Sequence, residues 1–147
     1  MNKINKFLLV ILLIGAFLRF VNIADYPVLN ADEASIGYNA YSLLQTGRDE
    51  HGNSWPIHFQ SFNDYKPGFY FYIVMPFVWF LGLNEYAVRI PGAILSTLTI
   101  LYLWFLVRKL FPDKKWLPEL SSLFLAISPW HIHFSRGGWE VSVATFF

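Results

Sequence analysis

No charged side chain occurs in residues 90–107, which read IPGAILSTLTILYLWFLV. As an α-helix at about 1.5 Å per residue, this run is about 27 Å long, close to the roughly 30 Å hydrocarbon core of a bilayer. Arg108 and Lys109 follow it directly. The run therefore predicts a membrane span with a basic flank.

Further apolar runs lie on both sides of this stretch. Hydrophobic residues make up 55% of the 147 residues and charged residues only 14%, whereas soluble domains carry about 25% charged residues. We therefore predict an all-α, polytopic membrane protein with spans at about 7–23, 86–107 and 117–133. Residues 141–147 would begin a further span, which suggests a truncated chain.

The first run is preceded by Lys3 and Lys6, and Arg19 is expected to snorkel at its far end. A cleaved signal peptide is the alternative interpretation, since a charged start followed by an apolar run is typical of one. No small-x-small cleavage site follows, however, and residues 22–24 make a poor one. A retained span is favoured.

Basic residues near spans prefer the cytoplasm, and this rule orients the chain. If the basic groups near residues 3–6 and 108–115 are both cytoplasmic, an even number of crossings separates them. The aromatic segment 67–82, interrupted by Pro76, would then lie in the outer interface or dip in and return. In the alternative topology this segment spans, and Asp32 and Glu140 fall on opposite sides.

The polar external loop, residues 24–85, contains a predicted helix at residues 30–47. Asn30 can cap it, Glu33 occupies the capping-box position and Gly47 can terminate it. One apolar stripe would lie on a membrane surface or on other helices; its members are Ile36, Ala40, Leu43 and Leu44.

Two acids open this helix and are the candidate catalytic residues. First-turn carboxylates interact favourably with the helix dipole, which is explanation enough for Glu33 as the capping partner. Asp32 is not needed for the cap. A partly desolvated carboxylate beside a membrane can accept a proton from an attacking hydroxyl, so Asp32 is the candidate general base.

Three cations and one further acid are expected on the same outer face. Lys66, Arg89 and Arg136 are either snorkelling anchors or ligands of a lipid phosphate, which suits the planar guanidinium fork. Glu140 could cap a following helix, orient substrate or hold a divalent cation. These four residues are the candidate substrate-binding set.

Several classes of site are absent from the sequence. The chain has no Cys, which excludes disulfides and thiolate metal sites. It contains no Gly-rich phosphate loop, nucleophile elbow or zinc-ligand spacing, and we predict no metal centre. No basic stripe indicates nucleic acid as a partner.

Four short motifs occur in order along the chain. They are NADEA at residues 30–34, DYKPG at 64–68, NEYAVRIP at 84–91 and SPWHIHFSR at 128–136. Together they resemble the N-terminal module of the GT-C superfamily of membrane glycosyltransferases, in its protein O-mannosyltransferase and ArnT-like branch. Gly68 departs from this pattern, because many relatives have a second proline there.

The resemblance implies transfer of a sugar from a polyprenyl-phosphate donor to a protein, lipid or glycan acceptor at the outer face of the cell membrane. Asp32 would be the catalytic base, Glu33 its neighbour in the site, and membrane lipids would contribute to donor binding. No cofactor is certain, although a divalent cation is compatible with the family. Residues 1–147 would be the N-terminal part of one such domain, inactive alone. A fragment of a polytopic transporter and a non-catalytic membrane scaffold are the alternatives.

Overall fold

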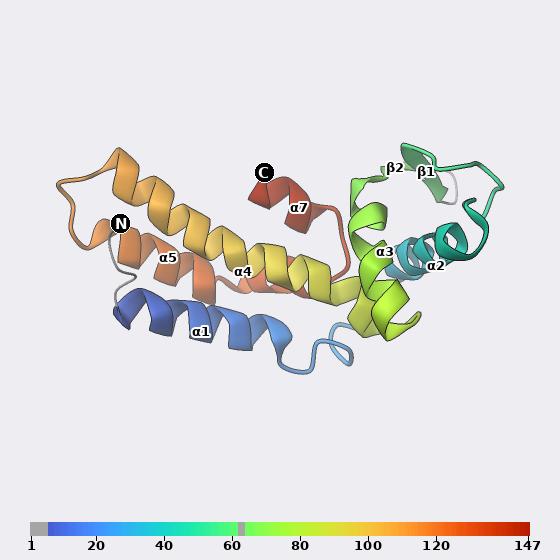
Figure 1. The fold of residues 1–147 in the computed structure, drawn as a ribbon. Helices are drawn as coiled ribbons and strands as arrows, with labels where there is room; N and C mark the ends of the chain where they lie inside the picture. Colours follow the sequence, from blue (N-terminus) through green and yellow to red (C-terminus); the bar gives the residue numbers. More distant parts are fainter. Residues whose placement is uncertain (1–5, 62–63) are drawn as a thin grey trace.

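A computed structural model describes residues 6–61 and 64–147, which are mostly helical. Figure 1 shows the arrangement of the elements. In chain order they are α1 (Lys6–Phe20), α2 (Ala31–Thr46), β1 (His58–Ser61), β2 (Asp64–Pro67), α3 (Phe69–Leu81), α4 (Glu85–Leu110), α5 (Leu117–Ile127), α6 (Pro129–Arg136) and α7 (Val141–Phe146).

The long helix α4 is the axis of the molecule. Helices α1 and α5 run along it, and α7 folds back against it after the chain turns at the end of α6 (Figure 1). Helices α2 and α3 and the β1–β2 hairpin gather at its N-terminal end, while the α4–α5 turn lies at its other end (Figure 1). The two ends of α4 thus carry different surroundings.

The prediction of a polytopic membrane protein is wrong. Within residues 6–61 and 64–147, α4 is the one helix that is long and apolar enough to cross a membrane. Helix α1 has 15 residues and α5 has 11, or about 22 and 16 Å of helix, too short for a core of about 30 Å. Multi-pass topology is therefore not supported.

The two expected spans fail because the backbone breaks inside them. Helix α1 ends at Phe20, and Asn22 takes a left-handed φ of 48° soon after. The segment 117–133 is divided at Ser128, whose extended backbone separates α5 from α6, and Pro129 opens the second helix. Lys3, one of the residues used to orient the chain, lies outside the described residues.

The predicted span at 86–107 lies within α4. The chain itself buries only 39% of its most apolar window, and bulky side chains such as Tyr102 and Phe105 are at least half exposed. Length and composition therefore support membrane association through this one helix.

The aromatic segment 67–82 forms α3, a helix of 13 residues with Pro76 inside it. It lies across the N-terminal end of α4 rather than alongside it (Figure 1). The hairpin that precedes it was not predicted: β1 and β2 pair antiparallel, with Phe59 opposite Lys66. Phe59 stacks on Phe71 of α3 at a ring-centroid distance of 4.0 Å, so the hairpin is fixed to the helix core.

The helix predicted at residues 30–47 is confirmed as α2. The Asn30 side chain accepts from the Glu33 amide at 2.9 Å, and the Glu33 carboxylate accepts from the Asn30 amide at 3.1 Å. Gly47 ends the helix in the left-handed region at φ 70°. Of the predicted apolar stripe, Ile36, Ala40 and Leu43 are buried, chiefly against α3, and Leu44 is partly buried. Placement on other helices, one of the two predicted settings, is what the structure has.

Candidate functional site

Asp32 and Lys66 meet on the surface of the α2–hairpin unit. Asp32 stands in the first turn of α2, and the Lys66 ammonium from β2 reaches its carboxylate Oδ1 to form an ion pair. The Asp32 side chain is 53% exposed, whereas the Lys66 side chain is only 13% exposed. The structure therefore brings together two predicted site residues that lie 34 positions apart.

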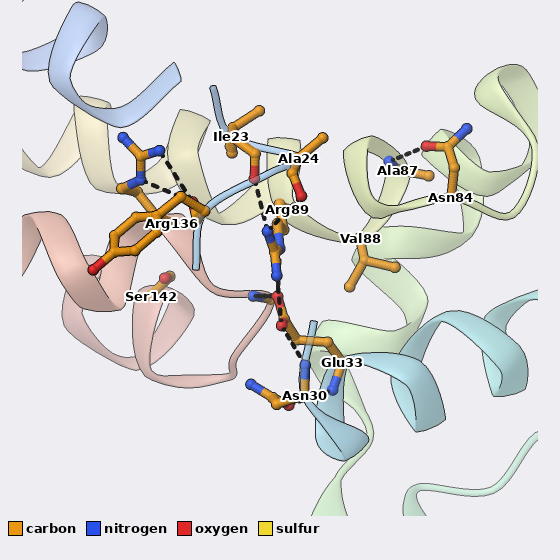
Figure 2. A network of polar contacts seen from close by, with 12 residues as sticks. Ile23, Ala24, Asn30, Glu33, Asn84, Ala87, Val88, Arg89, Arg136 and Ser142 are labelled. Carbon is orange, nitrogen blue, oxygen red and sulfur yellow. Dashed lines mark hydrogen bonds and ion pairs between the residues drawn. The ribbon is translucent and has the colours of Figure 1, made fainter. Parts of the chain in front are cut away.

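Glu33, the next residue, is in a different environment. It is fully buried, and its carboxylate accepts two hydrogen bonds from Arg89, from Nε at 2.7 Å and from Nη2 at 2.9 Å. It also accepts from the Gly138 amide at 2.8 Å. Figure 2 shows Glu33 and Arg89 facing each other between α2 and α4. Glu33 is thus a structural acceptor as well as the capping partner of Asn30.

Arg89 makes further hydrogen bonds in the same network. Its Nη1 donates to the carbonyl oxygens of Ile23 at 2.8 Å and Ala24 at 3.1 Å, and its side chain has no exposed surface (Figure 2). A buried guanidinium that already donates to Glu33, Ile23 and Ala24 is not available to an incoming phosphate. Arg89 instead ties the segment after α1 to the start of α2.

Arg136 has a similar structural setting at the end of α6. Its guanidinium donates to the carbonyl oxygens of Leu18 at 3.1 Å, Asn22 at 3.1 Å and Tyr26 at 3.0 Å. These acceptors lie in the last turn of α1 and the loop after it. Arg136 is 9% exposed, so it holds the two chain segments together and does not join Asp32 and Lys66.

Glu140 lies at the start of α7 without making a side-chain cap. Its Oε1 is buried and has no hydrogen-bond partner among the residues that the structure describes. No ion pair within the described residues joins it to Lys66.

An open hollow of about 480 Å³ adjoins the first turns of α2. Its polar lining comprises Ser35 and Tyr38 of α2, Glu50 and His51 of the following loop, and Ser61 of β1. Ala31 also lines it, and Ser61 is on the strand paired with the one that carries Lys66. Asp32 and Lys66 do not themselves line the hollow, but each neighbours a residue or strand that does.

Hydrogen bonds fix the acid in this hollow. Glu50 Oε1 accepts from Asn39 Nδ2 at 2.9 Å, and the Glu50 amide donates to Asn39 Oδ1 at 3.0 Å. Ser35 lies one turn before Asn39 and one turn after Asp32, so the three share one side of α2. The side of α2 next to its buried stripe thus carries these polar groups, with Asn39 buried and Asp32 half exposed.

Sequence reasoning missed a second buried cation. Arg19 was expected to snorkel, yet it is fully buried, and donates to the carbonyl oxygen of Ala126 at 3.1 Å and to His131 Nδ1 at 2.7 Å. Burial lowers the pKa of Arg19 to about 10, and burial together with Arg19 lowers the pKa of His131 to about 4. His131 is consequently a neutral acceptor at pH 7. The broken helix at Ser128, which exposes α5 carbonyls, is the signal that could have found this site.

No group of three or more His, Asp or Glu side chains within residues 6–61 and 64–147 is arranged to hold a metal ion. The described residues therefore do not form a divalent-cation site. Comparisons with family models, curated proteins and solved structures found no match to this chain. The resemblance to the GT-C superfamily therefore stays a prediction.

Proposed function

We propose that this chain forms part of a membrane-associated glycosyltransferase that uses a polyprenyl-phosphate-linked sugar. The observation that carries the proposal is the division of roles between two adjacent acids. Asp32 is half exposed beside a cation, next in sequence to a residue that lines an open hollow, whereas Glu33 is fully buried in a hydrogen-bonded pair with Arg89. Asp32 is free to meet a substrate and Glu33 is not.

The chemistry of transfer requires both members of the Asp32–Lys66 pair. The oxygen of an acceptor hydroxyl attacks the anomeric carbon of the sugar, and the bond from that carbon to the phosphate oxygen breaks. The proton of the acceptor hydroxyl passes to the Asp32 carboxylate, which acts as the general base. The electron pair leaves with the polyprenyl phosphate, and the Lys66 ammonium stabilises the negative charge that develops on it.

The hollow supplies groups suited to a carbohydrate. Ser35, Glu50 and His51 can exchange hydrogen bonds with sugar hydroxyls, and the half-exposed Tyr38 offers an aromatic face. Because the donor is a lipid, the site must lie near a membrane. Helix α4, which begins next to the α2–α3 unit, is long and apolar enough to hold it there.

The alternatives considered from the sequence fare differently. A transporter needs several spans to build a path, and the described residues offer one candidate span. This finding gives the transporter alternative no support. A non-catalytic scaffold does not need an exposed carboxylate. The transfer activity of Asp32 variants therefore distinguishes a scaffold from the proposed enzyme.

The test is transfer from a radiolabelled polyprenyl-phosphate sugar in membranes that carry the protein in its natural reading frame. Asp32→Asn keeps the size of the side chain but removes the base, which typically costs about 100- to 10,000-fold in rate. Asp64→Asn is the matched control, because Asp64 lies on the strand that carries Lys66, is exposed and does not pair with Lys66. Equal activity of the two variants, with equal amounts of folded protein, would refute Asp32 as the base. Failure of the unaltered protein to release polyprenyl phosphate from the sugars tried, in the presence of acceptor, would favour the scaffold.

A further inference from the structure

The α4–α5 turn, residues 108–117, concentrates positive charge at the end of the molecule opposite α2 (Figure 1). Its cations are Arg108, Lys109, Lys114 and Lys115. None of these four has a carboxylate within 4.0 Å in the part of the chain that the structure describes. Unpaired cations clustered on one turn attract an anion from outside the chain.

Two hollows shape this turn into a binding surface. One, of about 270 Å³, lies between the last turns of α4 and the start of α5 and is lined by Arg108, Lys114 and Lys115. Buried Trp104 forms one wall, with the Arg108 guanidinium carbon 4.8 Å from its ring centroid. Glu119 also lines it, which leaves three cations against one acid.

The Trp104 indole provides a separate indication of a ligand. Trp104 is 1% exposed, and its Nε1–H has no hydrogen-bond partner among residues 6–61 and 64–147. A buried donor without an acceptor is uncommon, because it costs about 1–3 kcal/mol in desolvation. Since Trp104 borders the basic hollow, an oxygen-rich anion seated there would meet both the cations and this wall.

The second hollow is apolar and selects the type of anion. It holds about 580 Å³ and shares Lys114 and Lys115 with the first. Asp113 also lines it, and its apolar walls include Phe111, Trp116 and Leu117. Trp116 is 71% exposed and Phe111 is 49% exposed. A free inorganic ion gains nothing from such side chains, whereas a lipid places its phosphate on the cations and its acyl chains on the aromatic surface.

From this combination we infer that the α4–α5 turn binds the phosphodiester headgroup of an anionic membrane lipid. Helix α4, the one candidate span, ends at Leu110 directly beside the turn. Basic residues immediately after an apolar helix are held at the headgroup level of an anionic leaflet. The site is separate from Asp32, so it stands whether or not the chain transfers sugars.

Native mass spectrometry of the detergent-solubilised chain tests this inference. Phosphatidylglycerol and phosphatidylcholine with identical acyl chains are compared as ligands, each with and without excess inorganic phosphate. We expect preferential retention of phosphatidylglycerol and no displacement by phosphate. Equal retention of the two lipids overturns the inference, and so does full displacement by phosphate, which would indicate a site for free anions.

Charge variants locate the site. Lys115→Gln should weaken phosphatidylglycerol binding about five-fold, the effect of about 1 kcal/mol per basic residue at an anionic surface. Lys114→Gln should act similarly, because it lines both hollows. Arg48→Gln is the control: it removes one exposed cation just after α2, which lies at the opposite end of the molecule (Figure 1), and should leave binding unchanged. Equal effects of Arg48→Gln and Lys115→Gln on lipid binding would mean that only the net charge of the protein matters. That result would refute a lipid site at the α4–α5 turn.

Discussion

Arg89→Ala should be among the most damaging substitutions in this protein, although Arg89 was selected from the sequence as a substrate ligand. The variant removes two hydrogen bonds to Glu33, at 2.7 and 2.9 Å, and two to the carbonyls of Ile23 and Ala24. It also leaves the Glu33 carboxylate, fully buried, without its cation. Removing one partner of a buried ion pair costs about 3–5 kcal/mol.

This cost can be read from thermal unfolding. For a chain of about 150 residues, each kcal/mol shifts the melting temperature by about 2–4 °C, so we expect a decrease of about 6–20 °C. The measurement is tryptophan fluorescence in one detergent, with the parent and the variant side by side. Arg48→Ala is the control; Arg48 is exposed and its side chain donates to the Gly52 carbonyl at 3.3 Å, so we expect a change within about 0.5 kcal/mol.

The double variant Glu33→Gln/Arg89→Ala tests whether the lost stability comes from the unpaired Glu33 carboxylate. Removing the charge of Glu33 relieves the uncompensated buried carboxylate, so this variant should recover part of the stability lost in Arg89→Ala. A melting temperature for Arg89→Ala within a degree or so of the parent would refute the assignment of Arg89 to the framework. It would return Arg89 to the set of residues free to bind a phosphate.

Two further predictions follow from local contacts. Because burial lowers the pKa of His131 from 6.5 to about 4, the unfolded chain binds a proton there that the folded chain does not; stability falls as the pH drops through this window. His131→Gln, which still offers Arg19 an acceptor, should have a smaller loss of melting temperature between pH 6.5 and 4, and an unchanged slope would contradict the shift. Gly68→Ala should cost about 1–3 kcal/mol in denaturant unfolding, since an added Cβ would lie 2.5 Å from the Ile57 carbonyl oxygen; unaltered stability would show that the hairpin yields freely.

The segment from Asn30 to Gly68 could be predicted in part because its signals are local. Asn30, Glu33 and Gly47 specify the start and end of α2 by contacts within a few residues, and all three occur as expected. The β1–β2 hairpin was missed because its strands have only four residues each. Gly68, noted only as a departure from a motif, is explained by close approach: its amide donates to the Ile57 carbonyl at 2.8 Å.

Two of the three predicted spans were wrong because hydropathy does not record where a helix breaks. Residues 117–133 are apolar on average, but Ser128 and Pro129 divide them into two short helices. The cations were misread for a related reason. Snorkelling is the ordinary outcome for an arginine at the end of an apolar helix, and it assumes that no carbonyl groups are near; Arg19 and Arg136 find such acceptors in distant chain segments.

The adjacent acids Asp32 and Glu33 show how a framework and a site can share one helical turn. Successive helix residues point about 100° apart, so one can face the core while the next faces outward. Glu33 turns toward α4, where Arg89 fixes the N-terminus of α2, and Asp32 is thereby directed toward Lys66. A substitution at Glu33 or Arg89 therefore displaces Asp32 as well as destabilising the fold. Loss of transfer in a Glu33 or Arg89 variant is therefore not enough to call either residue catalytic. The stability of each variant decides between a catalytic and a structural role.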